Sequence, residues 1–319
     1  MSEKQIPGET GDVPPPLVAI VGPTGVGKTQ LALRLGEEMD IEVVSADSRQ
    51  VYRYMDIGTA KPTPEERKRV PHHIIDVVDP DEEFTLAQFQ EMARAAIEDI
   101  LRRGKLPLLV GGTGQYVWAV LEGWQVPRVP PQHELRRQLY REAEEKGHQA
   151  LFERLRELDP KAAEFIDPRN VRRVVRAIEV CLITGKPFSS QREKSPPPYR
   201  TLIIGLTMER AELYRRIDAR IEKMLEKGLV EEVQRLLARG YGPDLPSMSG
   251  VGYWEIGRYL QGEISLDEAV RLMKKRTRNF VRHQYNWFRL TDPRIHWLES
   301  DENAPGKARD LISRFLSEL

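Results

Sequence analysis

Short apolar runs alternate with longer amphipathic stretches over the first third of the chain. Each run holds four to six residues, the length of a buried strand, and the predicted strands are residues 17–21, 42–45, 73–78 and 106–110. Apolar positions recur with helical spacing in residues 29–39 and 86–103, and the second stretch stops before Gly104, a suitable helix terminator. Strands separated by helices favour βαβ units, so a mostly parallel α/β sheet is predicted here.

The pattern changes after Gly123, where prolines interrupt the chain and strand-like runs disappear. Helical spacing then predicts four segments rich in Arg and Glu, at residues 132–146, 148–158, 160–166 and 170–184. A second proline-rich break, residues 194–199, precedes another predicted strand at 201–206. From Glu209 onward the pattern predicts helices, interrupted by a loop at 240–252.

This organisation predicts two domains. An all-helical domain of residues 128–199 is expected as an insertion into a sheet domain. The sheet domain would consist of residues 17–127 and 200–319, with a helical C-terminal region and a flexible tail at residues 1–16.

Composition places the chain among soluble globular proteins. Of its 319 residues, 40% are hydrophobic and 31% charged, which suits a sizeable core. Lys and Arg together number 49, as do Asp and Glu, so any nucleic-acid surface must come from local clustering of charge. One thiol, Cys181, can form neither an internal disulfide nor a Cys-rich zinc site, which favours a reducing, cytoplasmic location. The longest early apolar run, residues 17–21, is too short to span a bilayer, so no membrane association is expected.

Residues 22–29 carry the first chemical signal. Their sequence matches G-x-x-x-x-G-K-[ST] between a predicted strand and a predicted helix, the context that this phosphate-binding loop requires. Backbone N–H groups would surround phosphate oxygens, Lys28 would add a charge, and the Thr29 hydroxyl suits Mg²⁺. The candidate phosphate ligands are Gly22, Pro23, Thr24, Gly25, Val26, Gly27, Lys28 and Thr29. The motif predicts a P-loop NTPase-like sheet that binds a polyphosphate with Mg²⁺, but it does not specify ATP.

A kinase or ATPase would also carry an acidic residue at the end of a neighbouring strand. The strand at 106–110 runs instead into Gly111-Gly-Thr-Gly114, so Asp47, after the strand at 42–45, is the one candidate. Taken alone, Asp47 also suits a helix cap or a turn. Since the carboxyl ends of neighbouring parallel strands meet at one crevice, Asp47 and Thr113 are predicted to lie beside the phosphate loop.

Five segments, taken in this order, resemble the bacterial tRNA dimethylallyltransferase (tRNA isopentenyltransferase) family. They are residues 22–29, 47–62, 70–76, 111–116 and 249–253. The similarity extends from about Leu17 to about Leu298, and the combined pattern is far more specific than the phosphate loop alone.

The resemblance implies transfer of a prenyl group from dimethylallyl diphosphate to tRNA. The acceptor would be the exocyclic N6 amine of the adenosine at position 37, just 3′ of the anticodon, and diphosphate would leave. The phosphate loop and Mg²⁺ would then bind the diphosphate of the donor. Because no phosphoryl group is transferred, the missing second acid is no longer a difficulty.

The resemblance also implies roles for individual residues. Asp47 would be the general base, since the ring-delocalised amine is a poor nucleophile and proton acceptance is worth roughly 10²–10⁴-fold. Thr113 would line the junction between donor and acceptor. Lys28 would stabilise the charge on the departing diphosphate, and Arg220 would be a further ligand of it.

By the same resemblance, the anticodon stem-loop would contact both predicted domains, and the target base would be flipped out beside Asp47. The spacing of Arg172 and Arg176 also places them on one helix face. The candidate tRNA contacts are Asp47, Ser48, Arg49, Gln50, Thr113, Arg136, Arg172, Arg173, Arg176, Ser249, Gly250, Val251, Gly252, Tyr253, Trp254, Arg278 and Arg282.

A basic segment near the C-terminus also suits an RNA partner. Residues 271–289 hold seven Lys or Arg residues and no acid, interleaved with aromatic side chains. Such a segment favours phosphate contacts and base stacking, although an amphipathic helix with its aromatic residues in the core is the plainer alternative. We expect both, with Phe280, Trp287 and Phe288 mostly in the core. His283 stands where the family often has Arg, which puts that one phosphate contact in doubt.

Three other functions remain open from the sequence. A related enzyme could prenylate free AMP, ADP or ATP, but it would have little use for two arginine-rich regions. A small-metabolite kinase would consume ATP and ignore dimethylallyl diphosphate. A non-catalytic RNA-binding module would leave the phosphate loop and Asp47 without a purpose. No feature of the sequence requires more than a monomer.

Overall fold

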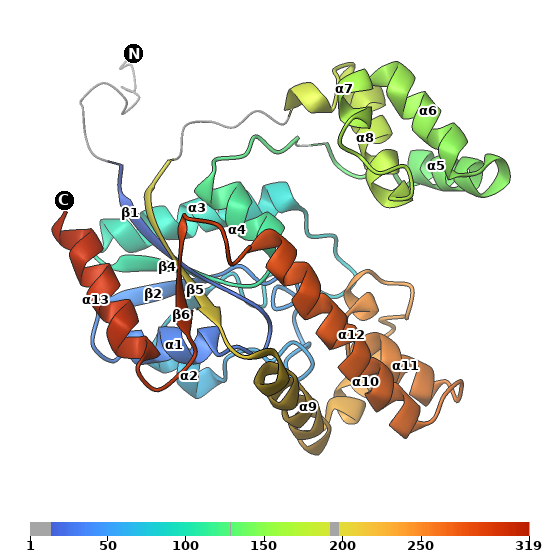
Figure 1. Ribbon diagram of the computed structural model, residues 1–319. Coiled ribbons are helices and arrows are strands. Elements are labelled where there is room, and N and C mark those ends of the chain that lie inside the picture. The colour runs from blue at the N-terminus through green and yellow to red at the C-terminus, as the bar shows by residue number, and fades with distance from the viewer. Residues whose placement is uncertain (1–13, 128, 192–197, 319) are drawn as a thin grey trace, which may run out of the picture. The chain divides into compact units, whose positions relative to one another are not determined.

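The computed structural model describes residues 14–127, 129–191 and 198–318. Its contacts divide the chain into two compact units (Figure 1). We call Met1–Leu121 with Pro198–Leu319 the sheet unit, and Glu122–Pro197 the helical unit. The sequence placed the two boundaries nearby, at 128 and 199. The predicted tail falls largely on residues 1–13, which lie outside the described residues, and Pro16 already belongs to a strand.

The sheet unit is built on six parallel strands in the order β3-β2-β4-β1-β5-β6, as an α/β pattern requires. The strands are β1 (Pro16–Val21), β2 (Ile41–Ser45), β3 (His72–His73), β4 (Leu106–Val110), β5 (Arg200–Thr207) and β6 (Ile295–Glu299). Every residue of β2 and β4 is buried, because helices cover both faces of the sheet. This explains why the strands read as apolar runs without alternation.

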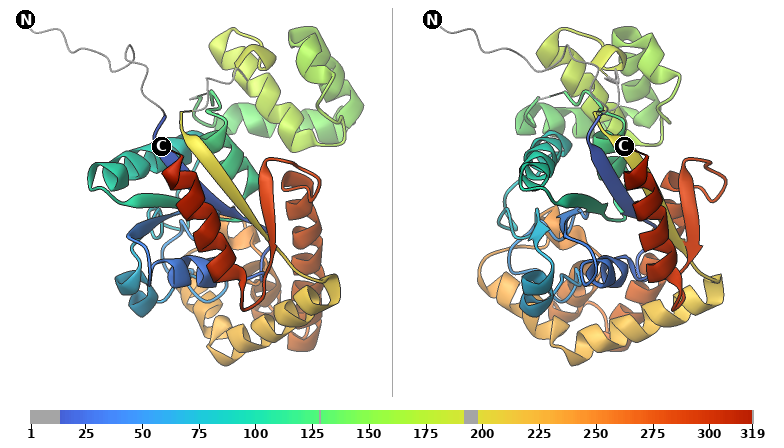
Figure 2. Two further views of the ribbon diagram at one scale, coloured as in Figure 1. Left: turned by 60° about the vertical axis from the view of Figure 1, so that its left-hand side comes forward. Right: turned by 90° about the vertical axis from the view of Figure 1, so that its left-hand side faces the viewer.

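Helices cover the sheet and extend beyond the carboxyl ends of its strands. Helices α1 and α13 lie on one face, and α3 and α4 on the other, while α9 to α12 gather past the ends of the strands (Figures 1 and 2). The helices of this unit are α1 (Lys28–Leu35), α2 (Pro64–Arg69), α3 (Leu86–Arg102), α4 (Gly114–Leu121), α9 (Arg210–Glu226), α10 (Leu229–Ala238), α11 (Tyr253–Leu260), α12 (Leu266–Trp287) and α13 (Ala304–Ser317). No described helix is long and apolar enough to cross a membrane.

The helical unit has a small apolar core of its own. It contains α5 (His133–Lys146), α6 (His148–Leu158), α7 (Pro160–Ala163) and α8 (Val171–Thr184). Leu139, Leu151, Leu155, Val174 and Ile178 are its central residues, and each of them is buried. Asp159 caps α7 through the Ala162 N–H and also accepts hydrogen bonds from Ser189, which connects the end of α6 to the segment after α8.

Two predictions about strands were wrong. The strand expected at 73–78 ends after His73, because Ile74 and Asp76 adopt φ values of 62° and 58° and turn the chain away from the sheet. The C-terminal region is not purely helical, since β6 adds an edge strand beside β5. Only Ile295 of β6 is buried, so this strand lacked the apolar run that identified the central strands.

Candidate active site

The phosphate loop connects β1 to α1 and has the backbone that its glycines predict. Gly22, Gly25 and Gly27 adopt φ values of 139°, 86° and 105°, which side chains rarely permit. A Cβ at Gly22 would lie only 2.4 Å from the backbone oxygen of Leu206 on the neighbouring strand β5. The loop can therefore pass this close to the sheet only with glycine at position 22.

Lys28, the first residue of α1, folds back over the loop. Its Nζ donates to the backbone oxygens of Gly22 and Pro23 at 2.9 and 2.8 Å. Burial lowers the pKa of Lys28 from 10.5 to about 8, while the carboxylate of Asp47 opposes this shift and the guanidinium of Arg220 adds to it. Three charged groups from distant parts of the sequence therefore lie within electrostatic range of one another.

Arg220 projects from α9 toward the same place. Burial lowers its pKa, and Asp47 again opposes the shift. Its Nε is buried and has no hydrogen-bond partner among the described residues. Since buried N–H groups are almost always satisfied, this guanidinium is suited to a bound anion.

Asp47 follows β2 and stands next to Thr113, which follows β4. Asp47 Oδ1 accepts hydrogen bonds from the backbone N–H groups of Arg49 (2.8 Å) and Gln50 (3.4 Å). The backbone N–H of Ser48 donates to Thr113 Oγ1 at 3.1 Å. Asp47 Oδ2 accepts no hydrogen bond from any described residue, so it is available to a ligand. The prediction that adjacent parallel strands would bring these two residues together is thus met by the geometry.

A cavity of about 310 Å³ within the sheet unit is lined by Asp47, Thr113 and Arg220. From α9 and α12 it is lined by Ile217, Arg220, Ile221, Met224, Met273, Arg276, Thr277, Phe280 and Gln284. The other lining residues come mostly from loops, and they are Thr24, Asp47, Ser48, Arg49, Gly58, Thr59, Gly112, Thr113, Ser249, Gly250, Val251 and Tyr253, the first residue of α11. The cavity therefore has a charged end at the phosphate loop, a polar rim and an apolar wall.

Comparison with known proteins identifies relatives that transfer isopentenyl or dimethylallyl groups. The family model "IPP transferase" matches residues 50–291, and "Isopentenyl transferase" matches residues 15–76. The tRNA dimethylallyltransferase of Roseiflexus sp. is 60% identical over 90% of this chain and 93% of its own. That of Dehalococcoides mccartyi is 48% identical over 95% and 93% of the two chains.

The chain belongs to the IPP transferase family, the tRNA dimethylallyltransferases. Solved structures of related transferases have a similar fold. The tRNA isopentenylpyrophosphate transferase of Bacillus halodurans is 42% identical, with a TM-score of 0.71 over 95% of this chain and 97% of that one. A eukaryotic dimethylallyltransferase acting on tRNA is 28% identical, with a TM-score of 0.79 over 95% and 80%.

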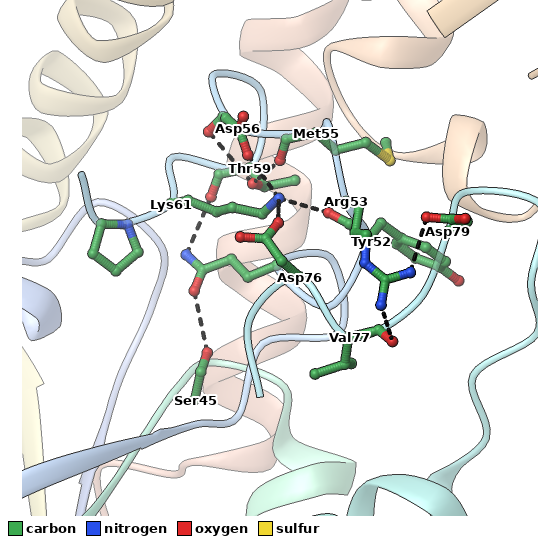
Figure 3. Close-up of polar contacts among 12 residues, drawn as sticks. Ser45, Tyr52, Arg53, Met55, Asp56, Thr59, Lys61, Asp76, Val77 and Asp79 are labelled. Carbon is green, nitrogen blue, oxygen red and sulfur yellow. Dashed lines mark hydrogen bonds and ion pairs between the residues drawn. The ribbon is translucent and has the colours of Figure 1, made fainter. Parts of the chain in front are cut away.

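In this member of the IPP transferase family, a buried lysine fixes the loop that carries the cavity-lining residues Gly58 and Thr59. Lys61 Nζ donates to the backbone oxygen of Tyr52 at 2.6 Å, to Asp56 Oδ1 at 2.8 Å and to Asp76 Oδ1 at 2.5 Å (Figure 3). Asp76 also accepts from Arg67 at 2.7 Å. The carboxylates neutralise the buried ammonium group, and together they hold the turns that replace the predicted strand at 73–78.

Gln50 belongs to this scaffold. Ser45 Oγ donates to its Oε1 at 3.1 Å, and its Nε2 donates to the backbone oxygens of Thr59 and Ala60 at 3.4 and 3.3 Å. Both ends of the amide are thus used within the protein, and Gln50 does not line the cavity. Its neighbour Arg49 does line the cavity and binds the backbone oxygens of Pro246 (2.7 Å) and Ser247 (3.2 Å).

Two buried residues that organise the site were missed from the sequence. Glu232 of α10 accepts from the backbone N–H groups of residues 56, 57 and 58 at 2.9, 2.8 and 3.1 Å, and from Tyr253 Oη at 2.7 Å. Gln284 of α12 accepts from the Thr24 N–H at 2.7 Å and donates to the Gly112 oxygen at 3.0 Å. No motif marks either residue, because their roles depend on how α10 and α12 pack.

The candidate RNA contacts on α11 and α12 are partly paired within the protein. Arg278 binds Asp218 at 2.5 Å, and Arg276 binds Glu255 at 2.8 Å. The guanidinium groups of Arg276 and Arg258 both stack over the ring of Trp254, which is 36% exposed. Arg282 is exposed and bonds to Asn279 on the same helix.

The aromatic residues of α12 are less buried than predicted. Phe288 is in the core, but Phe280 and Trp287 are 45% and 44% exposed, so their expected burial was wrong. Phe280 lines the cavity instead. Trp287 packs over Gly114, and its backbone oxygen accepts from Trp118 Nε1 at 3.1 Å.

The arginines of the helical unit divide into two groups. Arg136 and Arg176 both bind the fully buried carboxylate of Glu179, at 2.9 and 2.7 Å, and so stabilise the unit internally. Arg172 and Arg173 are exposed, and Arg173 also lies over the ring of Phe165. Exposed guanidinium groups are the better candidates for phosphate contacts.

Proposed function

We propose that this chain transfers the dimethylallyl group of dimethylallyl diphosphate to the N6 amine of adenosine 37 in tRNA. Membership of the tRNA dimethylallyltransferase family supports this reaction. The observation that carries the proposal is the cavity lined by Asp47 and Arg220, with Lys28 within electrostatic range of both. The cations suit the leaving diphosphate, and the carboxylate suits the attacking amine.

The charged end of the cavity would bind the donor. The backbone N–H groups of the phosphate loop and the positive end of the α1 dipole favour an anion, and Lys28 and Arg220 add two charges. Lys28 would exchange its bonds to Gly22 and Pro23 for phosphate oxygens. These groups stabilise the negative charge that grows on the diphosphate as the carbon–oxygen bond breaks.

The phosphate loop also suits Mg²⁺. Thr29 Oγ1 makes no hydrogen bond to any described protein group, and protein-bound Mg²⁺ commonly takes one or two protein oxygens together with substrate phosphates. Thr29 would hold the ion against the diphosphate, and Mg²⁺ would neutralise part of the leaving group's charge. We expect chelation by EDTA to abolish prenyl transfer and added Mg²⁺ to restore it.

Asp47 would act on the acceptor. The amine attacks carbon 1 of the donor, the carbon–nitrogen bond forms, the carbon–oxygen bond breaks, and Asp47 accepts the amine proton. The backbone N–H groups of Arg49 and Gln50 both donate to Asp47 Oδ1, which leaves Oδ2 to accept this proton. Thr113 and Ser48, joined by a hydrogen bond, would hold the rim against the base.

The RNA would reach the cavity by its anticodon loop. Stacking and hydrogen bonding in a pocket are the usual means of holding a flipped-out base. We assign Arg49 and residues 249–254 to the rim around that base. The exposed Arg172, Arg173 and Arg282 are assigned to phosphate contacts.

The test is a transfer assay with labelled dimethylallyl diphosphate and Mg²⁺. Parallel reactions contain unmodified tRNA, AMP or ATP, and the product is located by nuclease digestion and mass analysis. We expect label on one adenosine of the anticodon loop and none on free nucleotides. Label on AMP or ATP alone would reject tRNA as the substrate, and consumption of ATP without label transfer would favour a kinase.

A further inference from the structure

The apolar wall of the cavity is a regular ladder of side chains from two antiparallel helices. Ion pairs fix the register, with Asp218 against Arg278 at 2.5 Å and Glu222 against Lys274 at 2.8 Å. Moving four residues toward the C-terminus of α9 therefore corresponds to moving four residues toward the N-terminus of α12.

This register pairs the cavity-lining residues into three rungs. The first contains Ile217 and Phe280, the second Ile221 and Thr277, and the third Met224 and Met273. The first rung is at the donor end, because a Cβ at Gly25 of the phosphate loop would lie 3.1 Å from Ile217 Cγ1. Successive rungs are about one helical turn apart, ~5.4 Å.

The geometry of substitution directs the prenyl chain toward this ladder. In an in-line displacement, the leaving oxygen and the attacking nitrogen lie on opposite sides of carbon 1. The hydrocarbon must therefore project sideways from the line between the phosphate loop and Asp47. Most of the apolar side chains that line the cavity come from α9 and α12, whereas Ser48 and Thr113 are polar, so the prenyl chain is directed toward these two helices.

We propose that Met224 and Met273 set the chain length of the prenyl donor. This inference rests on the proposed function and adds a determinant of specificity to it. A five-carbon chain would occupy the first two rungs. Each further isoprene unit adds four chain carbons, similar in length to one helical turn, so a ten-carbon geranyl group would meet the methionine rung.

The methionine rung has the properties of a closed end. Met273 is 1% exposed and lies beside Gly252, which brings the loop after η2 (Ser247–Ser249) against it. Met224 is half-buried. Neither side chain needs a strong hydrogen-bond partner, so replacement by alanine would open space without leaving a costly unpaired polar group.

The test compares two donors in the full-length protein. Wild type, Met224→Ala and Met273→Ala are assayed with tRNA and either dimethylallyl or geranyl diphosphate. We expect the ratio of kcat/KM for geranyl over dimethylallyl diphosphate to rise at least tenfold in each variant. This magnitude follows from the roughly 10–200-fold discrimination that one methylene gives in an apolar pocket. Met92→Ala, at a 37% exposed position of α3 outside the cavity, is the matched control and should leave the ratio unchanged.

The outcomes separate the two proposals. An unchanged donor ratio in folded Met224→Ala would overturn the chain-length assignment, and Met224→Ala decides the question if Met273→Ala fails to fold. A rise in KM for tRNA with a constant donor ratio would also overturn it, since the rung would then contact RNA. Failure of the wild type to prenylate tRNA with either donor would reject the proposed function before any variant is compared.

Discussion

At the scale of single residues, the site is defined by three charged side chains, Lys28, Arg220 and Asp47, which interact electrostatically. Lys28 and Arg220 both have lowered pKa values because burial disfavours their charged forms, and Asp47 opposes both shifts. An anion with two phosphates would compensate these cations better than one carboxylate does. The cavity therefore holds positive charge ready for the donor.

The pKa of Lys28 predicts how donor binding depends on pH. Lys28 is protonated below about pH 8 and loses its charge as the pH rises through this value in the free protein. The kcat/KM for dimethylallyl diphosphate, which reports free-enzyme pKa values, should therefore fall above about pH 8. Lys28→Arg should lack this alkaline limb whatever its absolute rate, because Arg keeps its charge. A limb of the same midpoint in Lys28→Arg would contradict the assignment.

The same shift has a consequence for stability. Between pH 8 and 10.5 the unfolded chain still binds the Lys28 proton, whereas the folded chain has released it. Lys28 should thus make the free energy of unfolding increase with pH over this interval. Denaturant titrations of wild type and Lys28→Met at pH 8 and pH 10 measure the difference, and identical pH dependence would contradict it.

The positions of site residues could be predicted from sequence where a loop motif or the alignment of parallel strands determines them. The phosphate loop follows from its glycines, and Asp47 and Thr113 come together because parallel strands align their carboxyl ends. The burial of Arg220 and the bridging roles of Gln284 and Glu232 could not be predicted. Each depends on which side of α9, α10 or α12 faces the sheet, and that is decided by packing across more than a hundred residues of sequence.

At the scale of elements, α12 connects the apolar wall to the phosphate loop. The side chain of Gln284 bridges Thr24 on that loop and Gly112 before Thr113. A side chain at position 112 would collide with Gln284, since a Cβ there would lie 2.2 Å from Gln284 Nε2. Gln284 is therefore a positioning residue that fixes the distance between the donor loop and the acceptor rim.

Gln284→Ala should separate this positioning role from a general loss of stability. The variant leaves the partly buried Thr24 N–H and the buried Gly112 carbonyl without this partner, and the cost is about 1–3 kcal/mol for the buried carbonyl. We expect KM for dimethylallyl diphosphate to rise about tenfold or more. Asn286→Ala, at an exposed position of the same helix, is the control and should keep the wild-type KM. An unchanged KM in Gln284→Ala, together with a Tm lower than that of the control variant, would assign Gln284 a structural role only.

Elements could be predicted from sequence where hydrophobicity alone fixes them. β2 and β4 are buried throughout and appear as apolar runs. The turn at 74–78 has an apolar sequence too, but the buried Lys61 binds Asp76 and holds the backbone in a turn. β6 is a half-exposed edge strand, and only pairing with β5 defines it.

At the scale of the whole molecule, zero net charge requires that any RNA contact come from local groups of arginine. Many of the 49 Lys and Arg residues are not available, because pairs such as Arg136 with Glu179 hold the fold together. Arg172 and Arg173 are exposed on α8, and Arg173 also lies over the ring of Phe165. Helical spacing predicted that Arg172 and Arg176 share one helix face, and Arg176 pairs with Glu179.

The double variant Arg172→Ala/Arg173→Ala should weaken tRNA binding without affecting the donor. We expect a higher KM for tRNA, an unchanged KM for dimethylallyl diphosphate, and a shallower salt dependence of tRNA binding. The slope of log K against log[salt] should fall by about 0.7–0.9 for each phosphate that the variant no longer neutralises. Arg169→Ala removes an exposed arginine that pairs with Asp167 at 2.7 Å and serves as the control. An equal effect in the control would indicate a loss of general charge rather than of specific phosphate binding.

The central claim is that Asp47 accepts the proton of an RNA amine in the cavity where the diphosphate leaves. Its most direct test is a single-turnover measurement on Asp47→Ala, with saturating tRNA and dimethylallyl diphosphate, beside an equilibrium measurement of tRNA binding. We predict that the rate of prenyl transfer falls by two or more orders of magnitude, as the loss of a general base requires, while tRNA affinity stays nearly unchanged. Transfer at the wild-type rate would contradict the claim, and an equal loss of tRNA affinity would show that Asp47 serves binding instead.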